Sequence, residues 1–199
     1  MVAQVVAVSR DATHRFSKVP CEAITLMEGM GVLGDAHAGT LVQHRSRVRR
    51  DPNQPNLRQV HLIHAELLDE ARAAGHDVGP GSLGENILTE GLDLLALPAD
   101  TRLRIGSAVL RVTGLRNPCR QINDYSAGLL KVVVARTDGA ASTSEVTLSA
   151  TGGAESVDGV DIVRKAGVMA VIESGGTVRP GMPIDVVLPE EPHRPLAPV

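Results

Sequence analysis

One thiol in this sequence lies between two positive charges, in the stretch Gly114–Ile122. Pro118 fixes the backbone directly before Cys119, and Arg116 and Arg120 flank the thiol on either side. Positive charge favours the thiolate form of a cysteine, which is both a nucleophile and a ligand for soft metals. A nucleophile needs a base within reach, and the sequence by itself brings no histidine there. Cys119 is therefore a candidate metal ligand, a candidate nucleophile or a small buried core residue.

A second polar group lies in and after the four glycines of residues 29–39. Asp35 and His37 are two residues apart, so their side chains would share one side of an extended segment, and His44 follows them. An aspartate with two histidines resembles a metal-ligand set. A glycine-rich loop that carries these residues also forms hydrogen-bonded turns, and both interpretations stay open.

Positive charge is concentrated in one place. Four arginines fall within residues 45–50, although the chain has a net charge of −3. Arginine forks suit phosphate, so this run is either an anion site or a solvated surface, and the same choice holds for the cationic loop at residues 13–18. Asn86 either reads the edge of a heterocycle or closes a turn. A general role in nucleic-acid binding is disfavoured, because aromatic residues make up 1% of the chain and offer little surface for base stacking.

The scaffold that must position these side chains is predicted to be mainly β. Residues 65–74 form the one clear helix, which ends at Gly75, whereas residues 129–134 have no clear period. The predicted strands are 1–8, 21–26, 58–64, the end of 78–89, 103–113 as a hairpin turning at Gly106–Ser107, 163–173 and 184–188. Short strands between Gly and Pro turns, with no alternation of strands and helices, indicate a closed or partly closed β-barrel with a few short helices.

The whole chain, residues 1–199, is predicted to form a single domain, because its length suits one core. Residues 137–158 are rich in Gly, Ala, Ser and Thr and predict a flexible insertion, and the four prolines of residues 189–199 predict an extended tail. We find neither a signal peptide nor an apolar run of membrane-spanning length, so we expect a cytoplasmic protein in which Cys21 and Cys119 are free thiols.

Several motifs together are similar, in order and spacing, to the MOSC domain family, which is named for the C-terminal domain of molybdenum-cofactor sulfurase. These motifs are Gly34–Gly39, His44, Arg58–Val60, Gly84–Asn86, Asn117–Cys119, Gly181 and Ile184–Val186. The resemblance covers almost the whole chain and fits a stand-alone bacterial member. It implies a MOSC β-barrel, related to the barrel of pyruvate kinase.

The resemblance also implies a function. Members of the family bind the molybdenum cofactor (molybdopterin), with a cysteine, here Cys119, as the catalytic ligand to the metal. Those that are enzymes reduce N-hydroxylated bases and amidoximes, an oxidoreductase activity that serves detoxification. Asp35, His37 and His44 are implied to line the mouth of the site as catalytic or substrate-side groups. The residues implied to bind the cofactor are Arg45, Arg58, Gln59, Glu85, Asn86, Asn117, Arg120 and Lys165.

Two alternative functions stay open: a non-catalytic carrier of the cofactor or of sulfur, and a hydrolase or transferase that uses Cys119 as nucleophile. The pyridoxal-phosphate domain of the sulfurase is not found in this sequence, so no pyridoxal phosphate is expected to act here. The expected partners are a small N-hydroxylated substrate and a separate electron-transfer protein, without a nucleic-acid polymer or a membrane. The expected assembly is a monomer or a homodimer.

Overall fold

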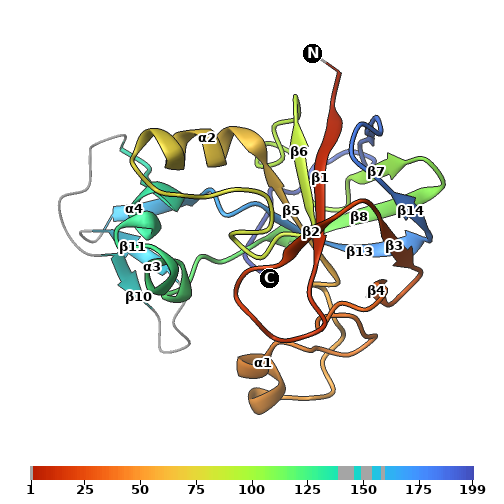
Figure 1. Cartoon of the computed structure of the whole chain (residues 1–199), viewed down its shortest axis with the longest axis horizontal. Coiled ribbons are helices and arrows are strands. Elements are labelled where there is room, and N and C mark those ends of the chain that lie inside the picture. Colours follow the sequence, from red (N-terminus) through yellow and green to blue (C-terminus); the bar gives the residue numbers. More distant parts are fainter. Residues whose placement is uncertain (1, 139–145, 149–153, 158–159) are drawn as a thin grey trace.

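The computed structural model describes residues 2–138, 146–148, 154–157 and 160–199 (Figure 1). Four short helices accompany the strands: α1 (Arg45–Arg50), α2 (Ala65–Ala73), α3 (Gln121–Tyr125) and α4 (Leu129–Val133). The strands are β1 (Gln4–Arg10), β2 (Val19–Cys21), β3 (Ile24–Met27), β4 (Gly31–Val32), β5 (Val60–His64), β6 (Ile87–Glu90), β7 (Arg102–Ile105), β8 (Ala108–Leu115), β9 (Val134–Arg136), β10 (Val146–Leu148), β11 (Ala154–Val157), β12 (Val160–Arg164), β13 (Val168–Ser174), β14 (Gly176–Val178) and β15 (Asp185–Val187).

The centre of the fold is an eight-stranded sheet in the order β15-β7-β8-β13-β5-β6-β1-β2. This sheet curls into a half-barrel, with a three-stranded sheet, β14-β3-β4, and a four-stranded sheet, β10-β11-β12-β9, beside it (Figure 1). The predicted mainly β class and partly closed barrel are confirmed. The predicted hairpin is also confirmed, because β7 and β8 pair from Ile105 opposite Ala108 across the Gly106–Ser107 turn.

The two faces of this sheet are covered by two separate cores. Successive side chains of a strand point to opposite faces. Leu62 of β5 therefore joins the first core, whereas its neighbour Ile63 joins the second core. Helices α2, α3 and α4 supply much of the second core and lie together on one side of the molecule, apart from α1 (Figure 1).

The expectation that strands and helices do not alternate is wrong at one place. β5 leads into α2, and the chain returns as β6, which pairs parallel to β5 with Leu62 opposite Ile87. A parallel pair needs a crossover connection, and α2 is that crossover, with Leu67, Leu68 and Ala71 fully buried. The helix itself was predicted, but its role in joining parallel strands depends on contacts that are distant in sequence.

Other boundaries also differ from the prediction. The arginine run forms α1, because arginine favours helices even where no apolar period marks one. Residues 129–134 become α4 followed by β9, and residues 21–26 are divided between β2 and β3. The strand predicted at 163–173 breaks at Gly167, which has φ +86°. A Cβ atom at this position would lie 2.0 Å from the carbonyl oxygen of Leu62, so the turn between β12 and β13 packs directly on β5.

The predicted insertion at 137–158 lies partly outside the described residues. Its described parts include β10 and β11, which pair with each other, and β11 pairs with β12. The tail at 189–199 returns to the end of β8, where the amide N–H of Leu115 donates to the carbonyl of Ala197 at 2.9 Å. None of the helices in the described part of the chain has the length and apolar character that crossing a bilayer requires.

Candidate functional site

Cys119 lies between the end of β8 and the start of α3 and is partly exposed. The partner found for its Sγ in the described part of the chain is Gln121 Oε1, at 3.7 Å. Both cysteines are free thiols, as predicted. Of the two arginines that flank Cys119 in sequence, Arg116 is buried and brings charge to the thiol, whereas Arg120 is exposed and its Nε lies 3.7 Å from Asp124 Oδ2.

Two arginines from distant parts of the sequence place positive charge near this thiol. Arg116 follows β8 and Arg58 precedes β5, and both guanidinium groups interact electrostatically with Cys119. Burial lowers the pKa of Arg116, and burial together with the charges of Arg47 and Arg116 lowers the pKa of Arg58 to about 9. Both shifts mean that the surroundings of Arg58 and Arg116 disfavour their positive charge.

Each of these arginines also has a buried N–H group without a partner. Arg58 Nε and Arg116 Nη1 are buried and have no hydrogen-bond acceptor in the described structure, although Arg58 Nη1 donates to the carbonyl of Val199 at 3.2 Å. Glu85 and the Phe16 ring also lie near the Arg116 guanidinium, but they do not accept from its Nη1 group, and buried donors are normally satisfied. The pair therefore has the character of a site for an anionic ligand next to Cys119.

A row of three imidazole rings leads to this pair. The ring centroids of His14 and His37 are 5.1 Å apart, and those of His37 and His44 are 4.5 Å apart. Burial, followed by the charges of Arg58 and other neighbouring cations, lowers the pKa of His44, so this ring is neutral at pH 7. The buried His44 Nδ1 likewise has no partner among the described residues.

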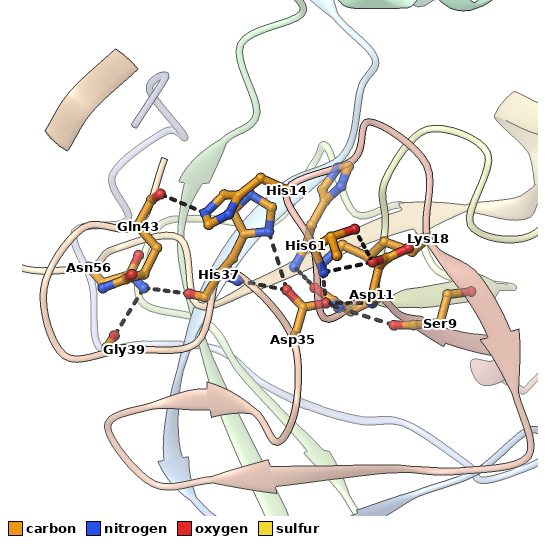
Figure 2. Close-up of polar contacts among 12 residues, drawn as sticks. Ser9, Asp11, His14, Lys18, Asp35, His37, Gly39, Gln43, Asn56 and His61 are labelled. Atoms are coloured by element: carbon orange, nitrogen blue, oxygen red, sulfur yellow. Dashed lines mark hydrogen bonds and ion pairs between the residues drawn. The ribbon is translucent and has the colours of Figure 1, made fainter. Parts of the chain in front are cut away.

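Asp35 anchors the middle of this row (Figure 2). Its carboxylate accepts hydrogen bonds from the backbone N–H of His37 at 2.9 Å, from His37 Nδ1 at 3.2 Å and from the ammonium of Lys18. Burial by itself would raise the pKa of Asp35, but these bonds outweigh burial and lower it, so the group is ionised. An ionised carboxylate only accepts, so His37 carries its proton on Nδ1 and leaves Nε2 available.

Three residues that were predicted to bind the cofactor have polar atoms bonded inside the protein. Asn86 accepts from the backbone N–H of His61 at 3.2 Å and donates to Asp35 at 3.0 Å. Gln59 donates to the Gly29 carbonyl at 2.7 Å and accepts from the Ile172 N–H at 3.0 Å. Glu85 accepts from the N–H groups of Gly81 and Leu83. These bonds indicate that the three residues support the backbone around the site. Asn86 also holds Asp35 in place.

The remaining predicted residues make different contacts. Asn117 accepts from Arg164 Nε at 3.0 Å, Lys165 forms an ion pair with Glu70 on α2, and Arg45 lies exposed on α1. The structure therefore brings Cys119, Arg58 and His44 together with the Asp35–His37 pair.

Sequence reasoning did not select Arg116, Lys18 or His14 as site residues. Arg116 had a local signal, since it stands three residues before Cys119. Lys18 and His14 lie in the cationic loop at residues 13–18, but no local pattern pairs Lys18 with Asp35 or His14 with His37. These pairs exist only because the loop folds over the glycine-rich turn.

The described residues contain no group of three or more His, Cys, Asp or Glu side chains arranged to hold a metal ion. The two hydrogen bonds from His37 to Asp35 agree with the interpretation of this segment as a hydrogen-bonded turn. A metal bound at Cys119 would have to bring its other ligands with it.

Fold and site together define a small, mainly β half-barrel protein with a thiol beside unsatisfied buried arginines. The profile of the MOSC domain family matches residues 35–185, and the chain belongs to this family. MOSC domains are associated with molybdenum-cofactor binding and sulfurase-like function. A comparison with curated proteins gives no significant match.

Solved structures share this fold. The YUAD protein from Bacillus subtilis superposes with a TM-score of 0.69 at 20% identity, over 96% of this chain and 98% of that chain. YiiM from Escherichia coli superposes with a TM-score of 0.55 at 17% identity, over 96% and 73% of the two chains. YiiM from Geobacillus stearothermophilus gives a TM-score of 0.55 at 13% identity, over 93% and 75%. At these identities the likeness concerns the fold.

Proposed function

We propose that this protein binds a molybdenum cofactor at Cys119, Arg58 and Arg116 and reduces N-hydroxylated compounds with electrons from a separate redox protein. The observation that carries the proposal is the pair of buried guanidinium groups with unsatisfied N–H donors beside a thiol. A cofactor with anionic dithiolene and phosphate groups would satisfy these donors, and molybdenum is a suitable metal for a thiolate ligand. The residues present therefore fit the group.

Each residue has a role in this proposal. Cys119 would ligate the metal, Arg58 and Arg116 would hold the anionic part of the cofactor, and the free Nδ1 of His44 would offer a further polar contact. When bound, the cofactor supplies two-electron reduction with removal of an oxygen atom.

The reaction also needs protons. Conversion of an N–OH group to N–H consumes two electrons and two protons and releases water. Asp35 fixes the Nδ1 proton of His37, which leaves His37 Nε2 as the atom that can carry a proton toward the substrate.

The metal content of protein made in a cofactor-competent host tests the core of the proposal. We expect molybdenum in the wild type and in Cys21→Ala, which removes the other thiol, and little molybdenum in Cys119→Ala. Absence of molybdenum from the wild type, or equal molybdenum in Cys119→Ala, would contradict the proposal.

Turnover separates an enzyme from a carrier. Cofactor-loaded protein with an artificial electron donor should reduce N-hydroxyadenine to adenine. Loaded protein that retains molybdenum and stays inactive would instead be a carrier. The nucleophile alternative has no support from the geometry, because no histidine of the described chain is hydrogen-bonded to Cys119.

A further inference from the structure

A separate cavity lies at the outer end of the imidazole row. It is an open pocket on the surface with a volume of about 570 Å³, lined by His14, Gln43, Arg45, Val48 and Arg49. The last three residues belong to α1 at positions i, i+3 and i+4, so they share one face of the helix. His14 fixes the cavity to the rest of the site, because its Nε2 lies 3.0 Å from the Gln43 carbonyl and its ring contacts that of His37.

The charge of this cavity is not neutralised within the protein. Arg45 and Arg49 are exposed, and no ion pair in the described part of the chain includes either one. Like charges one helical turn apart repel each other, and a phosphate that bridges two guanidinium groups removes this repulsion. Val48, which is 38% exposed, adds apolar surface between them.

The cavity is connected to Cys119 by side chains already described. His14 forms part of its wall, His37 follows at 5.1 Å between ring centroids, and His44 follows at 4.5 Å. His44 in turn interacts electrostatically with Arg58 and Arg116, and both of these arginines interact electrostatically with Cys119. The pocket at α1 and Cys119 therefore lie at the two ends of one row of contacting imidazoles and neighbouring guanidinium groups.

We propose that Arg45 and Arg49 bind the phosphate of a nucleotide, and that the substrates reduced at Cys119 are N-hydroxylated nucleotides. The second part rests on the proposed function, whereas the phosphate site does not. The volume lies within the range of small-molecule sites, about 300–1,000 Å³. An acidic protein partner is the competing class of ligand, but a stable protein interface buries about 800 Å² per partner, which a concave site with five lining residues does not suggest.

Calorimetric titration of AMP, adenosine and inorganic phosphate into cofactor-free protein tests the phosphate site directly. We expect AMP to bind more tightly than adenosine, and phosphate to compete with AMP. The double variant Arg45→Gln/Arg49→Gln should weaken AMP binding about 10- to 100-fold, as for loss of one to two charge-assisted bonds, and leave adenosine unchanged. Arg50→Gln is the matched control, because this exposed arginine of α1 does not line the cavity.

Several results would overturn the proposal. Equal affinity for AMP and adenosine would show that no phosphate site is present. Equal affinity for AMP and free phosphate would show that the site does not recognise the rest of the nucleotide. Loss of molybdenum from Arg45→Gln/Arg49→Gln would assign these arginines to the cofactor's own phosphate. Unchanged AMP affinity, together with slower reduction by a protein donor, would make α1 a docking site instead.

The last experiment compares substrates in the loaded enzyme. We expect a higher kcat/KM for the N-hydroxylated nucleotide than for the N-hydroxylated base, and we expect Arg45→Gln/Arg49→Gln to remove this advantage without affecting the base. An equal kcat/KM for both substrates would overturn the substrate assignment. Wild-type protein that binds AMP as expected but contains no molybdenum would refute the proposed function and leave the phosphate site standing.

Discussion

Replacement of Asp35 by alanine should be the most destabilising single change in the polar site. The Asp35 side chain is 1% exposed, and its ion-pair partner Lys18 is 5% exposed. Asp35→Ala would leave the Lys18 ammonium buried without its carboxylate and would remove an acceptor from Asn86 and His37. Breaking a buried pair from one side typically lowers the free energy of unfolding by about 3–5 kcal/mol. For a chain of this size that corresponds to a fall in Tm of roughly 6–20 °C.

Urea unfolding at pH 7, followed by circular dichroism, measures this loss from the midpoint at constant m. Asp69→Ala is the matched control, because the Asp69–Arg72 pair is also in hydrogen-bond contact, at 2.8 Å, but lies on the surface. It should lose less than about 1 kcal/mol. The double variant Lys18→Met/Asp35→Ala removes both charges and should be more stable than Asp35→Ala by itself.

Two results would refute this reasoning. A loss in Asp35→Ala no larger than that in Asp69→Ala would show that Lys18 and Asp35 are not buried against each other. If Lys18→Met is measured as well, and the double variant loses as much stability as Lys18→Met and Asp35→Ala together, the two residues do not interact.

Three further predictions follow from the same structure. The folded pKa of Asp35 lies below its unfolded value, so the stability that the ionised carboxylate contributes is complete above about pH 4 and is lost as pH falls through the folded pKa. In urea unfolding, the difference in unfolding free energy between the wild type and Asp35→Asn should therefore become smaller below about pH 4. Molybdate should raise the Tm of the wild type but not of Arg58→Met, because the anion needs the buried guanidinium. An equal rise in Arg58→Met would contradict the anion site. Thermal melts should show Gly167→Ala losing more stability than Gly75→Ala: both glycines have positive φ, but only at Gly167 would a Cβ lie 2.0 Å from a carbonyl oxygen, so equal losses would contradict the packing of this turn.

The parts of the fold that sequence reasoning predicted depend on local patterns. The hairpin at 103–113 and the helix at 65–74 each have a period and a turn or end signal within a dozen residues. The parallel pairing of β5 with β6 has no such signal, because the strands are related through a crossover rather than a turn. Helix α1 was missed for a different reason: with four arginines and one valine it has no apolar face that a periodicity could reveal.

The same division holds for the candidate site. Cys119 and the family motifs were visible in the sequence, and so was the proximity of Arg116, because these features lie within a few residues of one another. Arg58 stands 58 residues before Arg116 in the chain and reaches it only because β5 and β8 both pair with β13. The pairing of Lys18 with Asp35 likewise depends on two loops that meet in space.

The sequence by itself determined the residue types, the mainly β class and the family motifs around Cys119, since these depend on composition, local propensity and short spacings. The tertiary structure alone decided which charges are neutralised. It buried Asp35 against Lys18 and His37, and it left Arg58 Nε and Arg116 Nη1 without hydrogen-bond partners among the described residues. The physical reason is that the energy of a charged group depends on its desolvation and its neighbours, and both are properties of the folded chain.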